Sequence, residues 1–194
     1  ALSLEHCGYL VLDEADQMLD MGFIHALKKI AKHIPLKRQT LLFSATMPKL
    51  IEDLAGTYLR DPIKVQVAPP GKPVERISQG VHYIPNGDKA RVLEEYLKKH
   101  PGEQALVFGR TKHGSDKLAR VLEGWGFSVG AIHGNKSQNQ RERILQSFRA
   151  GEVKVLVATD VAARGIYIPH VGHVYTYDLP NVPENYVHRI GRTA

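Results

Sequence analysis

The sequence predicts an α/β fold of parallel sheets with helices on both faces, divided into two domains. Short apolar runs alternate with amphipathic helical patterns, which is the rhythm of β-α-β units. The stretch from Ala68 to Pro73, Ala-Pro-Pro-Gly-Lys-Pro, interrupts that rhythm and is typical of a stiff interdomain linker, although it also suits a surface loop. We therefore expect a first domain over residues 1–68, a linker over 69–76 and a second domain over 77–194.

Three strands and two helices are predicted in the first domain. Continuous apolar runs indicate buried strands, apolar residues at helical spacing indicate the helices, and proline marks a helix end or start. In chain order the elements are a strand at 9–12, a helix over 24–34 that Pro35 ends, a strand at 40–43, a helix that begins at Pro48, and a strand at 63–67.

The second domain repeats the alternation with more elements. Its strands are predicted at 77–84, 105–108, 129–132, 153–158 and 174–177. Its helices are predicted over 88–100, from about Leu118 to a stop at Gly126, over 137–149 with Ser137 as N-cap, and over 183–190.

Composition excludes some classes of protein. No apolar run approaches the ~20 residues of a membrane span, and the N-terminal residues do not resemble a signal peptide. The single cysteine, Cys7, has no internal disulfide partner, so we expect a cytoplasmic protein without a membrane partner. Residues 1–70 hold 8 Lys/Arg and 8 Asp/Glu, so the whole net charge of +6 falls in 71–194. A basic region there suits nucleic acid, and equally an ordinary solvated surface.

Acidic residues follow the first predicted strand, in the order Asp13-Glu14-Ala15-Asp16. An aspartate at a strand end can hold Mg²⁺ beside phosphate groups, and the next glutamate can act on the attacking water. The same residues also suit a helix N-terminus, whose dipole favours negative charge. Ligands of parallel sheets bind at the carboxyl ends of strands, where further polar residues are predicted: Ser44, Arg110, His133, Thr159 and Asp160.

Five motifs together resemble the DEAD-box ATP-dependent RNA helicases of superfamily 2. They occur in the family order: Val11 to Phe23 (VLDEADQMLDMGF), Ser44-Ala45-Thr46, Gln138 with Arg141, Ala158 to Gly165 (ATDVAARG), and His188 to Thr193 (HRIGRT). The segments 110–114 and 133–138 look most similar to the bacterial RhlE-like branch. The resemblance implies two RecA-like lobes, the first incomplete and the second nearly complete.

The resemblance also implies ligands and residue roles. The ligands would be ATP, Mg²⁺ and single-stranded or short duplex RNA. Catalysis would fall to Asp13, which holds Mg²⁺ through water, to Glu14 as base, and to Arg192 as arginine finger. Coupling between the lobes would involve Asp16, Ser44, Thr46, Arg164 and His188. The nucleotide would contact Gly165, Tyr167 and Arg189, and RNA would contact Arg110, His133, Gly134, Gln138, Arg141 and Thr159.

Other interpretations of single residues stay open. Ser44 and Thr46 also suit ordinary helix caps, His133 a packed histidine at a strand end, Arg141 an exposed helix face, and His188 a surface position.

The sequence departs from the family in three places. It holds no G-x-x-x-x-G-K-[ST] loop, it ends before a further arginine to which the family's sixth motif continues, and Tyr167 stands where the family has a ribose-binding aspartate. We therefore expect a fragment that does not hydrolyse ATP alone, and a first domain that is loosely packed, swapped between chains or docked on the second. Two other functions remain: a stand-alone RNA-binding module without ATPase activity, and a translocase acting on DNA.

Overall fold

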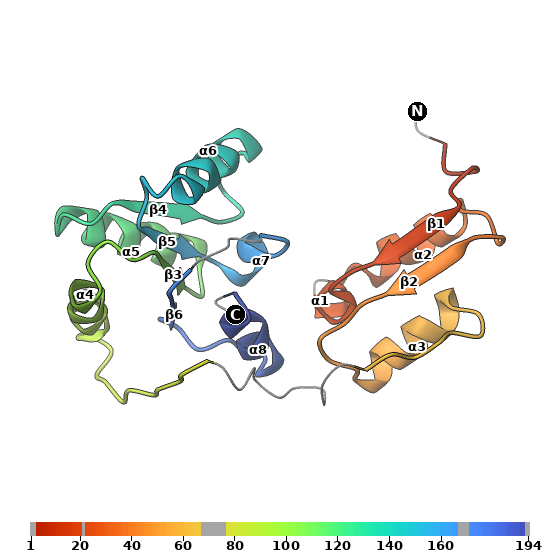
Figure 1. Ribbon diagram of the computed structural model, residues 1–194, viewed down its shortest axis with the longest axis horizontal. Helices are drawn as coiled ribbons and strands as arrows, with labels where there is room; N and C mark the ends of the chain where they lie inside the picture. Colours follow the sequence, from red (N-terminus) through yellow and green to blue (C-terminus); the bar gives the residue numbers. More distant parts are fainter. Residues whose placement is uncertain (1–2, 21, 67–76, 167–170, 193–194) are drawn as a thin grey trace. The chain divides into compact units, whose positions relative to one another are not determined.

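The computed structural model describes residues 3–20, 22–66, 77–166 and 171–192, and divides into two compact units, 1–72 and 73–194 (Figure 1). Each unit contains its own parallel sheet. The predicted linker over 69–76 lies outside the described residues.

The first unit is a two-stranded parallel sheet with three helices. Strand β1 (Tyr9–Leu12) pairs with β2 (Gln39–Leu42) in the register Tyr9 to Gln39 through Leu12 to Leu42. The helices are α1 (Ala15–Asp20), α2 (Ile24–Ala31) and α3 (Lys49–Tyr58). The strands predicted at 9–12 and 40–43 are confirmed, the second with a shift of one residue.

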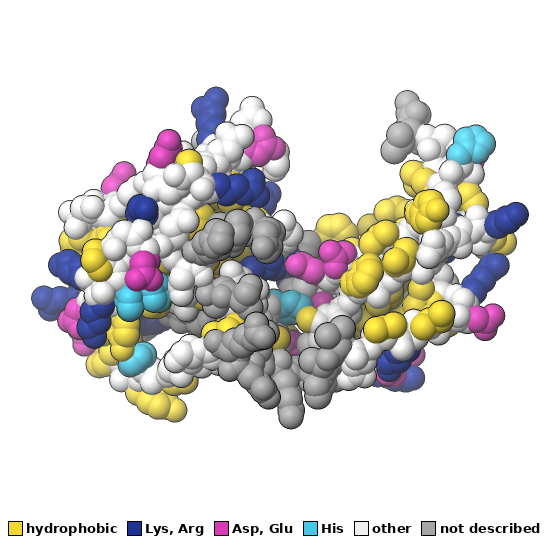
Figure 2. Space-filling model, viewed as in Figure 1, with side chains coloured by type: hydrophobic (Ala, Val, Ile, Leu, Met, Phe, Trp, Pro, Cys, Tyr) yellow, Lys and Arg dark blue, Asp and Glu magenta, His cyan; other side chains and the backbone are white. Residues whose placement is uncertain are grey.

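The core of the first unit lies on one face of its sheet. Leu12 packs with Leu27 of α2 and with Leu54 and Tyr58 of α3. Along β1 the residues between the core positions point outward, as expected from the period of two in a strand. Tyr9 is 74 % exposed and Val11 is 55 % exposed. Figure 2 shows hydrophobic side chains gathered on the surface of this unit. An apolar sheet face therefore remains exposed.

The second unit is a four-stranded sheet in the order β4-β5-β3-β6, parallel throughout. Its strands are β3 (Ala105–Phe108), β4 (Val129–Ile132), β5 (Val155–Ala158) and β6 (His173–Thr176). Its helices are α4 (Lys89–Lys99), α5 (Lys112–Gly124), α6 (Gln138–Arg149), α7 (Asp160–Ala163) and α8 (Glu184–Ile190).

Two cores cover the two faces of this sheet. On one face Leu106, Phe108 and Leu156 pack against Phe148 of α6 and the alanines of α7. On the other face Ala105 and Val107, the alternate residues of β3, pack with α4 and α5. All four residues of β3 and of β5 are buried, which explains why these strands read as continuous apolar runs. The prediction of helices on both faces is confirmed here.

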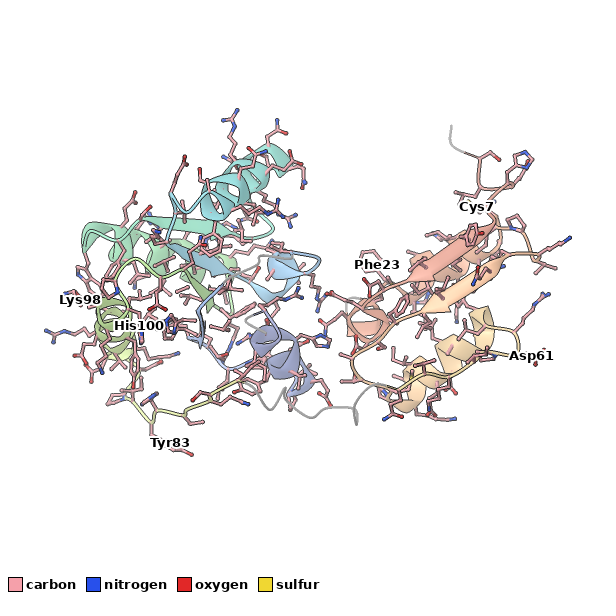
Figure 3. The ribbon with its side chains drawn as sticks, viewed as in Figure 1. Cys7, Phe23, Asp61, Tyr83, Lys98 and His100 are labelled. Atoms are coloured by element: carbon pink, nitrogen blue, oxygen red, sulfur yellow. The ribbon has the colours of Figure 1, made fainter. Side chains whose placement is uncertain are left out.

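Two predicted strands are wrong. Residues 63–66 form no strand, and Ile63 is 92 % exposed; Val67, the last residue of that prediction, lies outside the described residues. Residues 77–84 also form no strand, and Tyr83 is 97 % exposed (Figure 3). Alternation of apolar and polar residues predicts an extended chain, but a strand also needs a neighbour to pair with, and neither segment has one.

Local signals at helix ends are confirmed. Ser137 caps α6: its Oγ accepts the Gln140 N–H at 3.3 Å, and Gln140 Oε1 accepts the Ser137 N–H at 3.0 Å. Gly126 follows α5 with φ +87°, the left-handed conformation that glycine adopts without strain. No helix in the described part of the chain is long and apolar enough to cross a membrane.

Candidate functional site

The turn after β1 presents the first two acidic residues. Asp13 Oδ1 accepts the backbone N–H of Glu14 at 2.9 Å, and the Asp13 side chain is exposed. Glu14 has φ +50°, a left-handed backbone that costs a non-glycine residue of order 1–3 kcal/mol. Backbone bonds of Phe43 hold the turn: it donates to the Leu12 carbonyl at 2.8 Å and accepts from Ala15 at 3.0 Å. The sheet therefore imposes this strained conformation.

The third acidic residue, Asp16, is buried and joined to Thr46. Its Oδ2 accepts both the Thr46 backbone N–H and the Thr46 hydroxyl, each at 2.8 Å, and its Oδ1 accepts the Gln17 N–H at 2.9 Å. Asp16 is 6 % exposed and Thr46 8 %. Hydrogen bonds to a buried carboxylate are about twice as strong as neutral ones, so this contact fixes the loop after β2 against α1.

Ser44 completes the contact. Its Oγ donates to the Thr46 carbonyl at 2.7 Å and accepts the Asp16 N–H at 3.2 Å. The N-cap of α3 is Pro48, and no side chain caps that helix. The interpretation of Ser44 and Thr46 as caps of the following helix is therefore wrong. We call the hydrogen-bonded set Asp16, Ser44 and Thr46 the DEAD–SAT node.

In the second unit an ion pair lies beyond the carboxyl end of β5. Arg189 Nε and Nη2 donate to the two Asp160 carboxylate oxygens at 2.6 and 2.8 Å, and Nη1 donates to the Asp178 carbonyl at 2.5 Å. Arg189 is 1 % exposed and lies over the Phe108 ring, 5.0 Å from its centroid. Every nitrogen of the guanidinium thus has a partner inside the unit, and the nucleotide contact of Arg189 stays a prediction.

Asp178 is a residue of this edge that sequence reasoning missed. Its carboxylate accepts from Lys89 Nζ at 2.6 Å and from the Arg110 backbone N–H at 3.0 Å. Burial acts to raise the pKa of Asp178, but these two contacts outweigh it and hold the pKa below the ordinary aspartate value. The contact orients Arg110, whose Nη2 also donates to the Leu179 carbonyl at 3.4 Å.

His133 lies at the carboxyl end of β4 with its ring buried. The ring is 1 % exposed, and Nε2 lies 2.9 Å from Asp116 Oδ1, at ion-pair distance but outside hydrogen-bond geometry. Nδ1 accepts the Asn135 N–H at 3.3 Å. Burial acts to raise the pKa of Asp116, but His133 and Lys136 hold it below its usual value. The interpretation of His133 as a packed histidine is supported, and its contact with RNA stays a prediction.

Two arginines beside α7 retain buried donors. Arg141 Nη2 donates to the Ala162 carbonyl at 3.2 Å, while its buried Nε has no hydrogen-bond partner among the residues that the structure describes. Arg164 has two such atoms, Nε and Nη1. Thr159, 8 % exposed, starts α7 without capping it by its side chain. Buried donors without a partner are rare in proteins, so an acceptor outside the described residues, such as water or a ligand, suits these arginines.

The remaining predicted residues are placed within the second unit. Arg192 Nη1 donates to the Ile166 carbonyl at 3.0 Å, and Gly165 between α7 and Ile166 has φ +66°. Gln138 Nε2 donates to Glu142 on exposed α6 at 2.8 Å. At Gly134 a Cβ would crowd the Lys112 side chain, with 3.2 Å to Cε. His188 is half-buried in α8. Tyr167 lies outside the described residues.

Parallel sheets with polar residues at the carboxyl ends of their strands fit the RecA-like fold. Two family descriptions match: "DEAD/DEAH box helicase" over residues 1–54 and "Helicase conserved C-terminal domain" over 88–194. The chain belongs to the DEAD-box helicases of superfamily 2. The likeness to the RhlE branch stays a prediction.

Curated relatives are similar over the whole chain. The DEAD-box ATP-dependent RNA helicase CshA of Geobacillus kaustophilus is 47 % identical over 193 residues, which are 100 % of this chain and 41 % of that protein. The ATP-dependent RNA helicase RhlB of Shewanella frigidimarina is 45 % identical over 195 residues, covering 100 % and 45 %. The chain therefore spans less than half the length of these relatives.

Solved structures agree with this assignment. Dbp5 of S. cerevisiae, bound to RNA and ADP BeF3, matches with a TM-score of 0.90 and 33 % identity over 99 % of this chain and 51 % of that one. A DEAD box protein from Methanococcus jannaschii matches with a TM-score of 0.57 and 39 % identity, covering 98 % and 51 %.

Proposed function

We propose that this chain carries the coupling and RNA-binding parts of an ATP-dependent RNA helicase, which joins RNA-stimulated ATP hydrolysis to local unwinding of RNA. The observation that carries the proposal is the DEAD–SAT node, because it links the turn that presents Asp13 and Glu14 to the loop after the next strand. The node would therefore transmit movement at one loop to the other. The curated relatives, named as ATP-dependent RNA helicases, support the same activity.

The residues of the DEAD turn suit ATP and Mg²⁺. The exposed Asp13 carboxylate offers oxygen ligands, which Mg²⁺ prefers, commonly through water. When bound, the ion would neutralise charge on the phosphates. Glu14, held in its strained backbone conformation by the sheet, would orient and deprotonate the attacking water.

RNA would bind along the carboxyl ends of β4 and β5. The buried Arg141 Nε, which has no hydrogen-bond partner among the described residues, supports this, since phosphate oxygens are acceptors that guanidinium groups bind. Single-stranded RNA and short duplexes share that backbone chemistry. Thr159 and the backbone around Gly134 lie at the same strand ends and would add contacts. We place the protein in the cytoplasm, where its RNA would be found.

The chain by itself would not hydrolyse ATP. Residues 1–194 contain no phosphate-binding loop, and that loop supplies the lysine and backbone cradle of the phosphates. Phosphate release should therefore stay at the level of Glu14→Gln, with or without RNA. Release above that of the variant would refute the statement.

Binding of a fluorescent single-stranded RNA across a salt series tests the RNA groove. Affinity should fall with salt, with a log-log slope of about −0.7 per phosphate contact. Arg141→Ala should weaken binding, while Arg149→Ala, an exposed arginine of the same helix, should change it little. Equal losses in both variants would mean diffuse attraction to a basic surface. Tight binding by a full-length parent that never hydrolyses ATP would favour the stand-alone RNA-binding module.

A further inference from the structure

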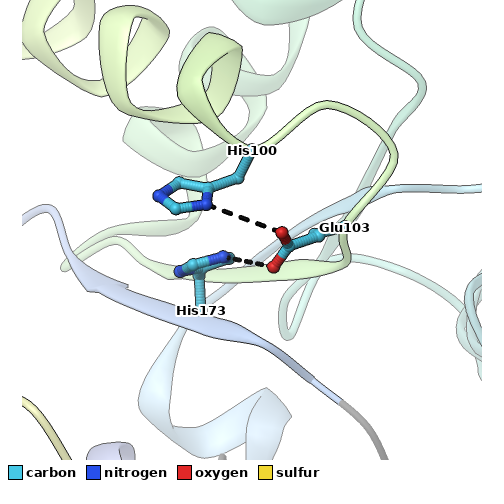
Figure 4. Close-up of side chains that lie close together, drawn as sticks. All are labelled: His100, Glu103 and His173. Atoms are coloured by element: carbon cyan, nitrogen blue, oxygen red, sulfur yellow. Dashed lines mark hydrogen bonds and ion pairs between the residues drawn. The ribbon is translucent and has the colours of Figure 1, made fainter.

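Three metal-ligating side chains meet in the second unit at a place that the helicase motifs do not use. They are His100 after α4, Glu103 before β3 and His173 at the start of β6 (Figure 4). Glu103 Oε2 lies 2.7 Å from His173 Nε2, and Oε1 lies 3.6 Å from His100 Nδ1. All three ligand atoms lie within 4.8 Å of one another.

The cluster lies at the amino ends of β3 and β6. The predicted nucleotide- and RNA-binding residues follow the carboxyl ends of the strands, at the opposite edge of the same sheet. Any ligand of the cluster would thus be held apart from the helicase chemistry. No other group of three such side chains was found in the part of the chain that the structure describes.

The backbone holds the three residues in place before any ligand arrives. A tight turn joins His100 to Glu103, with Gly102 at φ +82° and a hydrogen bond from the Glu103 N–H to the His100 carbonyl at 3.3 Å. His173 pairs with Ala105 in the sheet, and its N–H donates to the Gln104 carbonyl at 3.3 Å. The cluster therefore joins two chain segments about 70 residues apart without needing a mobile loop.

The two imidazole rings face one another beside the carboxylate. The ring centroids of His100 and His173 are 4.0 Å apart, and the Tyr175 ring lies nearly parallel to the His173 ring with its centroid 6.1 Å away. The site offers one exposed carboxylate and two half-buried imidazoles.

Two nitrogens and one oxygen are the donor set of open zinc sites, in which three protein ligands leave one position for water. Bonds of about 2.0–2.1 Å in a tetrahedron place ligand atoms roughly 3.4 Å apart, and the two distances here lie on either side of that value. Hard cations such as Mg²⁺ prefer oxygen alone. We propose that His100, Glu103 and His173 form a surface site for one Zn²⁺ ion, which ties the α4–β3 turn to β6.

Zinc binding is measured on the whole chain, without a purification tag, in competition with a chromophoric chelator. A Cys7→Ser background removes the only thiol. One Zn²⁺ per chain should bind, and Glu103→Gln should weaken it at least ~10-fold. His113→Gln is the matched control, because His113 is exposed outside the cluster. Mg²⁺ should not compete.

NMR of the histidine rings locates the ion. The ring signals of His100 and His173 should shift together with one Zn²⁺ equivalent, while the His113 signals stay in place. Gly172→Ala is a second variant that leaves all ligands present: its Cβ would lie 3.0 Å from Glu103 Oε2, so affinity should fall. Affinity equal to wild type in Glu103→Gln, or unmoved His100 and His173 signals, overturns the proposal and leaves an ordinary hydrogen-bonded cluster.

Discussion

Removal of one hydroxyl tests the DEAD–SAT node. Thr46→Val keeps the β-branched shape of the side chain and deletes the hydroxyl that donates to Asp16 Oδ2 at 2.8 Å. The backbone N–H of Thr46 still donates to the same oxygen. The change therefore isolates a single hydrogen bond to a buried carboxylate.

The magnitude follows from the charge and the burial of the pair. A hydrogen bond to a charged group contributes about 1.5–3 kcal/mol. Both Asp16 and Thr46 are under 10 % exposed, so water has little access to replace the lost donor. We expect the free energy of unfolding of the first unit to fall by about 2 kcal/mol. Thr46→Ser, which keeps the hydroxyl and loses one methyl group, should cost about 0.8 kcal/mol or less.

The assay must report on the first unit. The chain's one tryptophan, Trp125, lies in the second unit, so its fluorescence follows the wrong transition. Amide hydrogen exchange through β1 and β2 measures the first unit directly, and Trp125 fluorescence serves as an internal reference. Equal exchange in Thr46→Val and Thr46→Ser would refute the hydrogen bond. An equal loss in both units would mean a general effect of the substitution.

Three further predictions use urea unfolding of the second unit, followed by tryptophan fluorescence. Gly130→Ala should lower the free energy of unfolding by about 1–3 kcal/mol, since the new Cβ would lie 2.6 Å from Ile144 Cγ2 of α6. Gly124→Ala places its Cβ in open space within a helix, so it should raise the free energy of unfolding by about 0.5–1 kcal/mol. Asp160→Asn should cost about 3 kcal/mol by leaving the Arg189 charge buried, and a loss below about 1 kcal/mol would contradict the pair. Asp178 has a depressed pKa in the folded state. The stability that its ionised carboxylate adds to the fold is therefore complete above the unfolded pKa of about 3.9, and is lost as pH falls through the lower folded value. Asp178→Asn should remove that part of the acid sensitivity, and an unchanged pH profile would contradict it.

The strands of the second unit could be predicted because both faces of its sheet are covered. A strand that is buried on both faces must be apolar at every position, as Ala105–Phe108 is. Such a short unbroken apolar run is predicted as a buried strand. The segments 63–67 and 77–84 carry only alternation, which an extended exposed chain shares with a strand. The short helix α7 was missed because Asp160–Ala163 is too short to show a helical period.

The site could be predicted as a set of strand ends, but its contacts could not. Motif spacing located Asp16 and Thr46, which the structure joins. The ion pair of Asp160 with Arg189 connects residues 29 apart, and the contact of Lys89 with Asp178 connects residues 89 apart. No sequence period relates such partners, because the three-dimensional sheet brings them together.

The arginines at this edge fall into two kinds, and the difference decides what each substitution will do. Arg189 uses all three guanidinium nitrogens inside the unit, so its replacement removes internal contacts and lowers stability. Arg141 retains a buried donor without a partner among the described residues, so it already bears a cost of desolvation that a bound phosphate would relieve. Replacing Arg141 should therefore weaken RNA binding more than it weakens the fold, and that outcome would distinguish Arg141 from the structural Arg189.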